Sequence, residues 1–127
     1  MSASPDIRLS GLQLAIMRVL WTSEEATVNT VHAALRGKRS LAPTTVATLL
    51  KRLEKRGLLA HRSEGRQFVY RPLVSAAEVG RTLVGDLVDD LYAGNSSELF
   101  AHLLDAKDIA PGDLARIKEM IESKERG

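Results

Sequence analysis

Apolar residues in the first part of the chain recur at helical spacing and predict two consecutive helices. From Leu9 to Trp21 they return every three or four positions, and Ser10 stands where an N-cap is expected. A short polar break over 22–26 follows. Thr27 then begins a second amphipathic helix, which ends at about Gly37.

The third predicted helix has the clearest division into two faces. Pro43 suits its first turn, and Gly57 suits a left-handed C-cap. One face is an apolar strip: Val46, Leu49, Leu50 and Leu53. The opposite face carries short hydroxyl side chains followed by cations: Thr44, Thr45, Thr48, Lys51, Arg52 and Lys55. We expect the strip to pack inward and the polar face to meet a ligand or solvent.

After the third helix the pattern changes to two short extended runs. They cover Leu58–Ser63 and Gln67–Leu73, and the residues between them, 64–66, form a tight hairpin signal around Gly65. Three helices followed by a hairpin are typical of a winged helix-turn-helix. The fold class is therefore expected to be mainly α with a small β-hairpin, and residues 1–73 to form a DNA-binding domain.

Three further helices are predicted in residues 74–127. A capping box over Ser75–Glu78 starts the first helix, which should run to about Tyr92. A second cap at Asn95–Glu98 and the pair Ala110–Pro111 start the other two. About 50 residues make a marginal isolated core, so we expect a three-helix dimerisation domain. Its predicted apolar interface residues are Val79, Leu83, Leu87, Leu91, Leu99, Phe100, Leu103, Leu114, Ile117 and Ile121.

The distribution of charge supports this division. The net charge is only +2, but residues 1–72 carry +7 and residues 73–127 carry −5. A cationic half suggests a polyanionic partner. The chain has no cysteine, which excludes disulfides and thiolate metal sites. No apolar run approaches the roughly 20 residues of a membrane helix, and no signal peptide is visible, so a cytoplasmic protein without membrane contact of its own is expected.

These features lead to specific expectations for double-stranded DNA. Hydroxyls and methyl groups of Thr44, Thr45, Ala47 and Thr48 should face base edges in the major groove. Cations should reach the phosphate backbone or an adjacent minor groove: Lys51, Arg52, Lys55, Arg66 at the hairpin tip, and Lys38 and Arg39 in the loop before the third helix. A homodimer would present two such helices to a palindromic operator. The alternative for each charge run is a solvated helix face.

Neither an enzyme nor a metal or cofactor site is indicated. No glycine-rich phosphate loop, nucleophile elbow or zinc-binding helix motif occurs. The three histidines are scattered without ligand-like spacing. We expect them to be surface or packing residues.

Several stretches resemble the penicillinase-repressor family (the BlaI/MecI/CopY group) of winged helix-turn-helix regulators. They are LQLAIMRVLW (12–21), ATVNTVH (26–32), LAPTTVATLLKRLEKRGLL (41–59), GRQFVYRPLV (65–74) and FAHLLDAKDI (100–109). The resemblance covers nearly the whole chain. It implies a dimeric transcriptional repressor of dyad-symmetric operators, of the kind that controls β-lactam-response or copper-handling genes.

Two departures from the family pattern bear on regulation. The cysteine-rich tail of copper-responsive members is absent, which removes that route of copper sensing. The Asn-Phe bond that is cleaved in β-lactam-responsive members is replaced here by His102-Leu103. A membrane-bound sensor protease of different specificity stays open as a partner. Three alternative functions of the chain also stay open: an activator, a nucleoid-type DNA binder and a winged-helix protein-interaction module.

Overall fold

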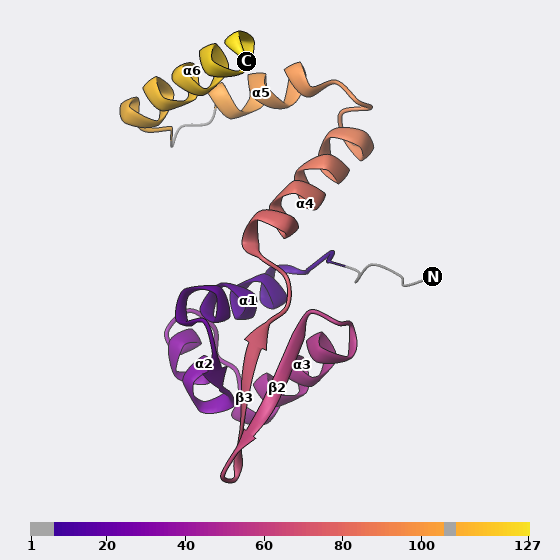
Figure 1. Cartoon of the computed structure of the whole chain (residues 1–127), viewed down its shortest axis with the longest axis vertical. Helices are drawn as coiled ribbons and strands as arrows, with labels where there is room; N and C mark the ends of the chain where they lie inside the picture. Colours follow the sequence, from indigo (N-terminus) through magenta and orange to yellow (C-terminus); the bar gives the residue numbers. More distant parts are fainter. Residues whose placement is uncertain (1–6, 106–108) are drawn as a thin grey trace. The chain divides into compact units, whose positions relative to one another are not determined.

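A computed structural model describes residues 7–105 and 109–127 of the chain (Figure 1). The described elements are α1 (Gly11–Ser23), β1 (Ala26–Thr27), α2 (Val28–Leu35), α3 (Pro43–Lys55), β2 (Leu59–Glu64), β3 (Gln67–Pro72), α4 (Ala76–Asp90), α5 (Ser96–Asp105) and α6 (Pro111–Arg126). This order confirms the predicted, mainly helical fold class. The predicted span from residue 1 and the family-like stretch 100–109 each include residues outside the described ranges.

The predicted hairpin is confirmed as β2 and β3, which pair antiparallel from Leu59–Pro72 to Glu64–Gln67. The turn between the last pair has two residues, and its first, Gly65, has φ +63°. Glycine adopts this backbone conformation without the steric cost of a Cβ. The hairpin tip projects past the ends of the helices beside it and forms the wing (Figure 1).

The sheet contains a third strand that the sequence did not predict. β1 pairs antiparallel with β3 through Ala26–Tyr70 and Thr27–Val69, so the strand order is β1-β3-β2. The predicted polar break over 22–26 was therefore wrong at its last residue, since Ala26 is buried. Two residues are too few to show an alternating pattern, and their extended conformation depends on β3 as a partner.

The helix starts follow the predicted capping residues. Ser10 Oγ accepts a hydrogen bond from the backbone N–H of Gln13 (3.3 Å), and the Gln13 side chain accepts one from the N–H of Ser10 (2.9 Å). Ser75 and Glu78 form the same reciprocal pair at 3.0 and 3.2 Å. Each pair satisfies N–H groups that have no partner within the helix.

The chain divides into two compact units, one that reaches to Val84 and one from Gly85 onward. The division lies inside α4 rather than after residue 73. Val79 explains the difference, because it is 2% exposed and belongs to the core that α1, α2, α3 and the sheet share. The assignment of a DNA-binding and a dimerising function to these parts stays a prediction.

Apolar side chains fill the first unit's core. The largest fully buried ones come from every helix before α4, from the sheet and from the residue before β2: Ile16, Met17, Leu20, Val31, Val46, Leu50, Leu53, Leu58, Leu59 and Tyr70. Among the described residues of the second unit, by contrast, Leu99 is the only buried apolar side chain. The first unit therefore has a conventional core, and the second has almost none.

Candidate nucleic-acid interface

Helix α3 presents the two faces that the sequence predicted. Val46, Leu50 and Leu53 are fully buried and fix the helix on the core. All six residues of the polar face are exposed: Thr44, Thr45, Thr48, Lys51, Arg52 and Lys55. No side chain caps the N-terminus, which begins at Ala42 and Pro43. An exposed row of hydroxyls and cations on a rigidly packed helix is what a major-groove reader requires.

The hydroxyl of Thr48 is engaged within the helix. It donates a hydrogen bond to the backbone carbonyl of Thr44, with 3.0 Å between oxygens. A threonine hydroxyl has one proton but two lone pairs, so in this rotamer Thr48 Oγ1 can still accept a bond. It can then contact the amino group of an adenine or cytosine, which donates in the major groove.

Between α3 and the wing lies a hollow of about 280 Å³, which brings together three of the predicted DNA-contacting residues: Ala47, Lys51 and Arg66. Its other lining residues are Thr27, Val28, Asn29, Gln67, Phe68 and Tyr70. The sequence predicted a base contact for Ala47 and phosphate or groove contacts for Lys51 and Arg66. The structure adds that all three border the same concave surface.

The hollow also contains a residue that the sequence reasoning missed. Asn29 is exposed in the first turn of α2 and lines the same surface as Lys51. In helix-turn-helix proteins the helix before the recognition helix crosses the phosphate backbone. The position of Asn29, two residues after the N-cap Thr27, was the signal that could have identified it.

Lys38 and Arg39, which were also predicted to contact DNA, lie elsewhere. They line a separate hollow with residues of α1 and α2, and none of its lining residues belongs to α3 or to the wing. The sequence placed them near DNA because they precede α3 in the chain. In the structure they follow the C-terminal end of α2, and their contact with DNA stays a prediction.

Two further cations of the first unit are held by protein groups. Arg56 donates to Gln13 Oε1 (3.4 Å) and to the carbonyl of Arg8, which connects the end of α3 to the start of α1. Arg62 forms ion pairs with Glu64 and, at 2.8 Å, with Glu25. The hydrogen bonds that Arg62 donates to Glu64 and Glu25 raise the pKa of Arg62 above its usual value. The carboxylates of Glu25 and Glu64 therefore offset the charge of Arg62, which the sequence alone does not show.

A hydrogen bond connects the wing to α3, and aromatic contacts connect its two strands. His61 Nδ1 on β2 lies 2.5 Å from Glu54 Oε2 on α3. The His61 ring also lies 4.2 Å, centre to centre, from the ring of Phe68 on β3. Burial, and to a smaller extent the nearby Glu54 carboxylate, raises the pKa of Tyr70. These groups connect β2 to α3 and β2 to β3, so they hold the base of the wing beside α3.

The predicted dimerisation residues fall into two groups. Val79 and Leu83 pack in the first unit's core, so they are not part of an open surface. Of the others, Leu99 is buried and Ile117 half-buried, and the rest are exposed: Leu87, Leu91, Phe100, Leu103, Leu114 and Ile121. The residues of the predicted cleavage region, His102 and Leu103, are exposed within α5, and His102 Nδ1 lies 2.7 Å from the hydroxyl of Tyr92.

Two other classes of site were searched for within the described residues. Over 7–105 and 109–127, no group of three or more histidine, aspartate or glutamate side chains is placed to hold a metal ion. Within the same ranges, no helix has both the length and the apolar character to cross a membrane.

Comparison with known proteins identifies the family. A family model described as "Penicillinase repressor" matches residues 9–123. The penicillinase repressor of Bacillus licheniformis is 25% identical over 115 residues, which are 91% of this chain and 90% of that protein. The transcriptional regulator BlaI of Mycobacterium tuberculosis (strain CDC 1551 / Oshkosh) is 38% identical over 91 residues, which are 71% of this chain and 64% of that protein.

A solved structure agrees with this assignment. The solution structure of the DNA-binding domain of the repressor BlaI matches with a TM-score of 0.52 and 35% identity, and the match covers 61% of this chain and 93% of that one. The fold, the sequence motifs and the relatives thus all indicate the same family. The chain belongs to the penicillinase repressor family, whose members are DNA-binding transcriptional repressors and not enzymes.

Proposed function

We propose that this protein is a homodimeric repressor that binds a palindromic operator through α3 and the wing. The observation that carries the proposal is the concave surface on which Lys51 of α3, Arg66 of the wing and Asn29 of α2 meet. Side chains from three elements can contact one duplex there at the same time. The names of the relatives, which include a penicillinase repressor and a BlaI DNA-binding domain, support the same function.

Roles within this surface follow from chemistry. The short side chains of α3 would read base edges: Thr44, Thr45, Ala47 and Thr48. Lys51, Arg52, Lys55 and Arg66 would neutralise phosphates, and Asn29 would donate to the backbone from α2. Lys38 and Arg39 are left out of the proposed DNA contacts because they line a different hollow.

Dimerisation is proposed through the second unit. Its helices expose large apolar side chains: Leu87, Leu91, Phe100, Leu103, Leu104, Leu114, Met120 and Ile121. Monomeric proteins rarely leave so much apolar surface in contact with water. A second copy, related by a two-fold axis, would cover this surface and pair two recognition helices with two half-sites.

The proposal places the protein in the cytoplasm, where chromosomal DNA is accessible to it. A membrane-bound sensor protease is proposed as a partner on the family resemblance alone. Since His102 and Leu103 lie inside α5, a protease would have to unwind that helix before it could cut between them.

The test compares the palindrome upstream of the protein's own gene with a random duplex over a range of salt concentrations. Affinity for the palindrome should be higher and should fall steeply with salt. Arg66→Ala should weaken binding to both duplexes alike and lower the salt slope by about 1, because one phosphate contact is lost. Thr48→Val should instead change the preference at one base pair by about 1–3 kcal/mol.

The matched control is Arg116→Ala, which removes one exposed cation from α6 and should leave both affinities unchanged. Equal affinity for the palindrome and for random DNA at moderate salt would contradict the repressor function. The same loss for Arg66→Ala and Thr48→Val on every sequence would contradict the division into backbone and base contacts.

A further inference from the structure

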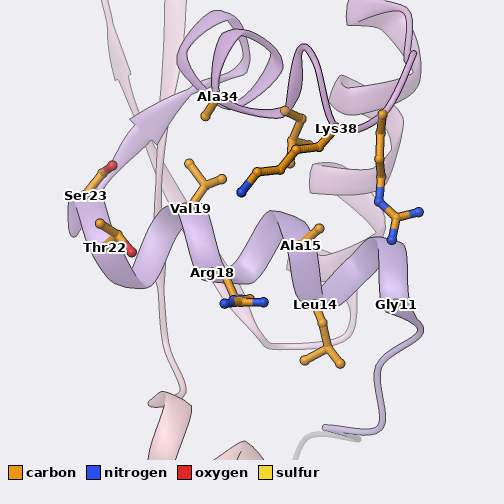
Figure 2. Close-up of a pocket in the computed structure, with 11 residues that line it drawn as sticks. Gly11, Leu14, Ala15, Arg18, Val19, Thr22, Ser23, Ala34 and Lys38 are labelled. Carbon is orange, nitrogen blue, oxygen red and sulfur yellow. The ribbon is translucent and has the colours of Figure 1, made fainter. Parts of the chain in front are cut away.

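A second concave surface of the first unit lies between α1, α2 and the loop that follows α2 (Figure 2). Its volume of about 760 Å³ is within the range of small-molecule sites. Apolar side chains form much of its lining: Leu14, Ala15, Val19, Ala34 and Leu35. It is thus large enough, and apolar enough, to shelter the body of a small organic molecule.

Three cations border this hollow: Arg18, Lys38 and Arg39. In Figure 2 the Lys38 side chain extends over the hollow toward Val19. The Arg39 guanidinium lies over the start of α1, 3.6 Å from where a Cβ of residue 11 would be. The hydroxyls of Thr22 and Ser23 border the hollow at the end of α1.

Among the described residues, no ion pair balances the charge of these cations. None of the lining residues is acidic, and within the part of the chain that the structure describes no ion pair involves any of the three. Arg56 and Arg62 in the same unit are both held by protein groups. The positive charges that border the hollow would attract an anion bound in it.

The backbone that carries two of these cations is held in place. The N–H groups of Lys38 and Arg39 both donate to the carbonyl of Leu35, at 3.0 and 2.9 Å. Gly37 makes this turn at φ +94°, a conformation that glycine adopts readily. A ligand would therefore meet a loop that is already ordered, which lowers the entropic cost of binding.

We propose that this hollow binds a small organic anion: an apolar body on α1 and α2, with a phosphate, sulfonate or carboxylate group held by Arg18, Lys38 and Arg39. The site lies at the C-terminal end of α2, whereas Asn29 at the other end of α2 lines the DNA-facing hollow. His32 Nε2, in the same helix, lies 2.8 Å from the carbonyl of Leu41, just before α3. A ligand on α2 would thus be coupled to the proposed DNA surface, and this second part of the inference rests on the proposed function.

The test is a titration of the ¹⁵N-labelled full chain with phenyl phosphate, followed by amide chemical shifts. Saturable shifts should appear at Ala15, Val19, Leu35 and Arg39. Inorganic phosphate, which lacks the apolar body, and phenol, which lacks the charge, should each give weaker shifts at these amides. Equal shifts with inorganic phosphate, or no saturable shift with phenyl phosphate, would overturn the proposal.

Variants separate charge from shape. Replacement of Arg18, Lys38 and Arg39 by glutamine should weaken phenyl phosphate binding by at least about tenfold, since charged hydrogen bonds are lost. The control replaces three exposed cations of α6 in the same way: Arg116, Lys124 and Arg126. Ala34→Trp, which keeps all three cations but fills the hollow, should abolish the shifts. Unchanged binding in the triple variant or in Ala34→Trp would overturn the site.

A last titration distinguishes a ligand site from an additional DNA contact and uses a short random duplex at low salt. Shifts confined to α3, the first turn of α2 and the wing support the proposal. Shifts at Lys38 and Arg39 as large as those at Lys51 and Arg66 would overturn it, because the cations would then serve DNA phosphates. If DNA shifts no residue while phenyl phosphate still binds, the proposed function fails and the ligand site stands.

Discussion

Leu50 in α3 and Leu103 in α5 are the same residue type on amphipathic helices, yet Leu50 is fully buried and Leu103 is 47% exposed. The difference extends to the units around them. The first unit encloses its apolar side chains between three helices and a sheet, and the second leaves most of its own in contact with solvent. A unit with a core of its own can present a rigid reading surface. A unit without one needs another surface to cover it.

The largest effect expected from this difference comes from one substitution made in both units. Leu50→Ala should lower the free energy of unfolding of the first unit by about 2–5 kcal/mol, because it leaves a cavity in a close-packed core. Leu103→Ala should leave that value nearly unchanged. Urea unfolding followed by the fluorescence of Trp21, the single tryptophan, measures the first unit alone. Equal losses in the two variants would contradict the contrast between the units.

A smaller effect should locate the boundary between the units within α4. Val79→Ala should lower the free energy of unfolding of the first unit by about 2 kcal/mol in the same urea experiment, since two carbon atoms are removed from the core. Val84→Ala, in the same helix but 52% exposed, should cost less than about 0.5 kcal/mol. If Val79→Ala were as mild as Val84→Ala, the start of α4 would not belong to the first unit.

The smallest expected effect concerns alkaline pH. Burial raises the pKa of Tyr70 above its usual value of 10.0, so the folded state disfavours the ionised phenol. The neutral Tyr70 side chain contributes to stability below about pH 10, and this contribution is lost as the pH rises through the pKa of Tyr70 in the folded state. The free energy of unfolding should therefore fall above about pH 10 in the native chain and fall less in Tyr70→Phe. An identical fall in the variant would show that Tyr70 does not contribute.

Sequence reasoning succeeded where local signals were strong. Pro43, the spacing of Val46, Leu50 and Leu53, and Gly65 in the hairpin turn define α3 and the wing almost to the residue. Helix periodicity and turn chemistry depend on neighbours in the chain, which the sequence displays directly. The exposed polar face of α3 could be predicted for the same reason.

It failed where a residue's environment depends on distant parts of the chain. β1 exists only because β3 lies beside it, and Val79 is buried only because the first unit's core lies next to α4. The net charge of +7 over residues 1–72 counts every cation equally, although Arg62 on β2 is paired with Glu25, which lies 37 residues earlier in the chain. Tertiary contacts decide which charges remain free.

We expect the first unit to be self-sufficient and the second unit to hold two copies of the chain together. Sedimentation equilibrium of the full chain and of a chain that ends at Val84 tests it most directly. The end point is Val84 rather than residue 73, so that Val79 stays in the core that it completes. We expect a dimer for the full chain and a folded monomer for the shorter one. A monomeric full chain, or a shorter chain that still forms a stable dimer, would contradict it.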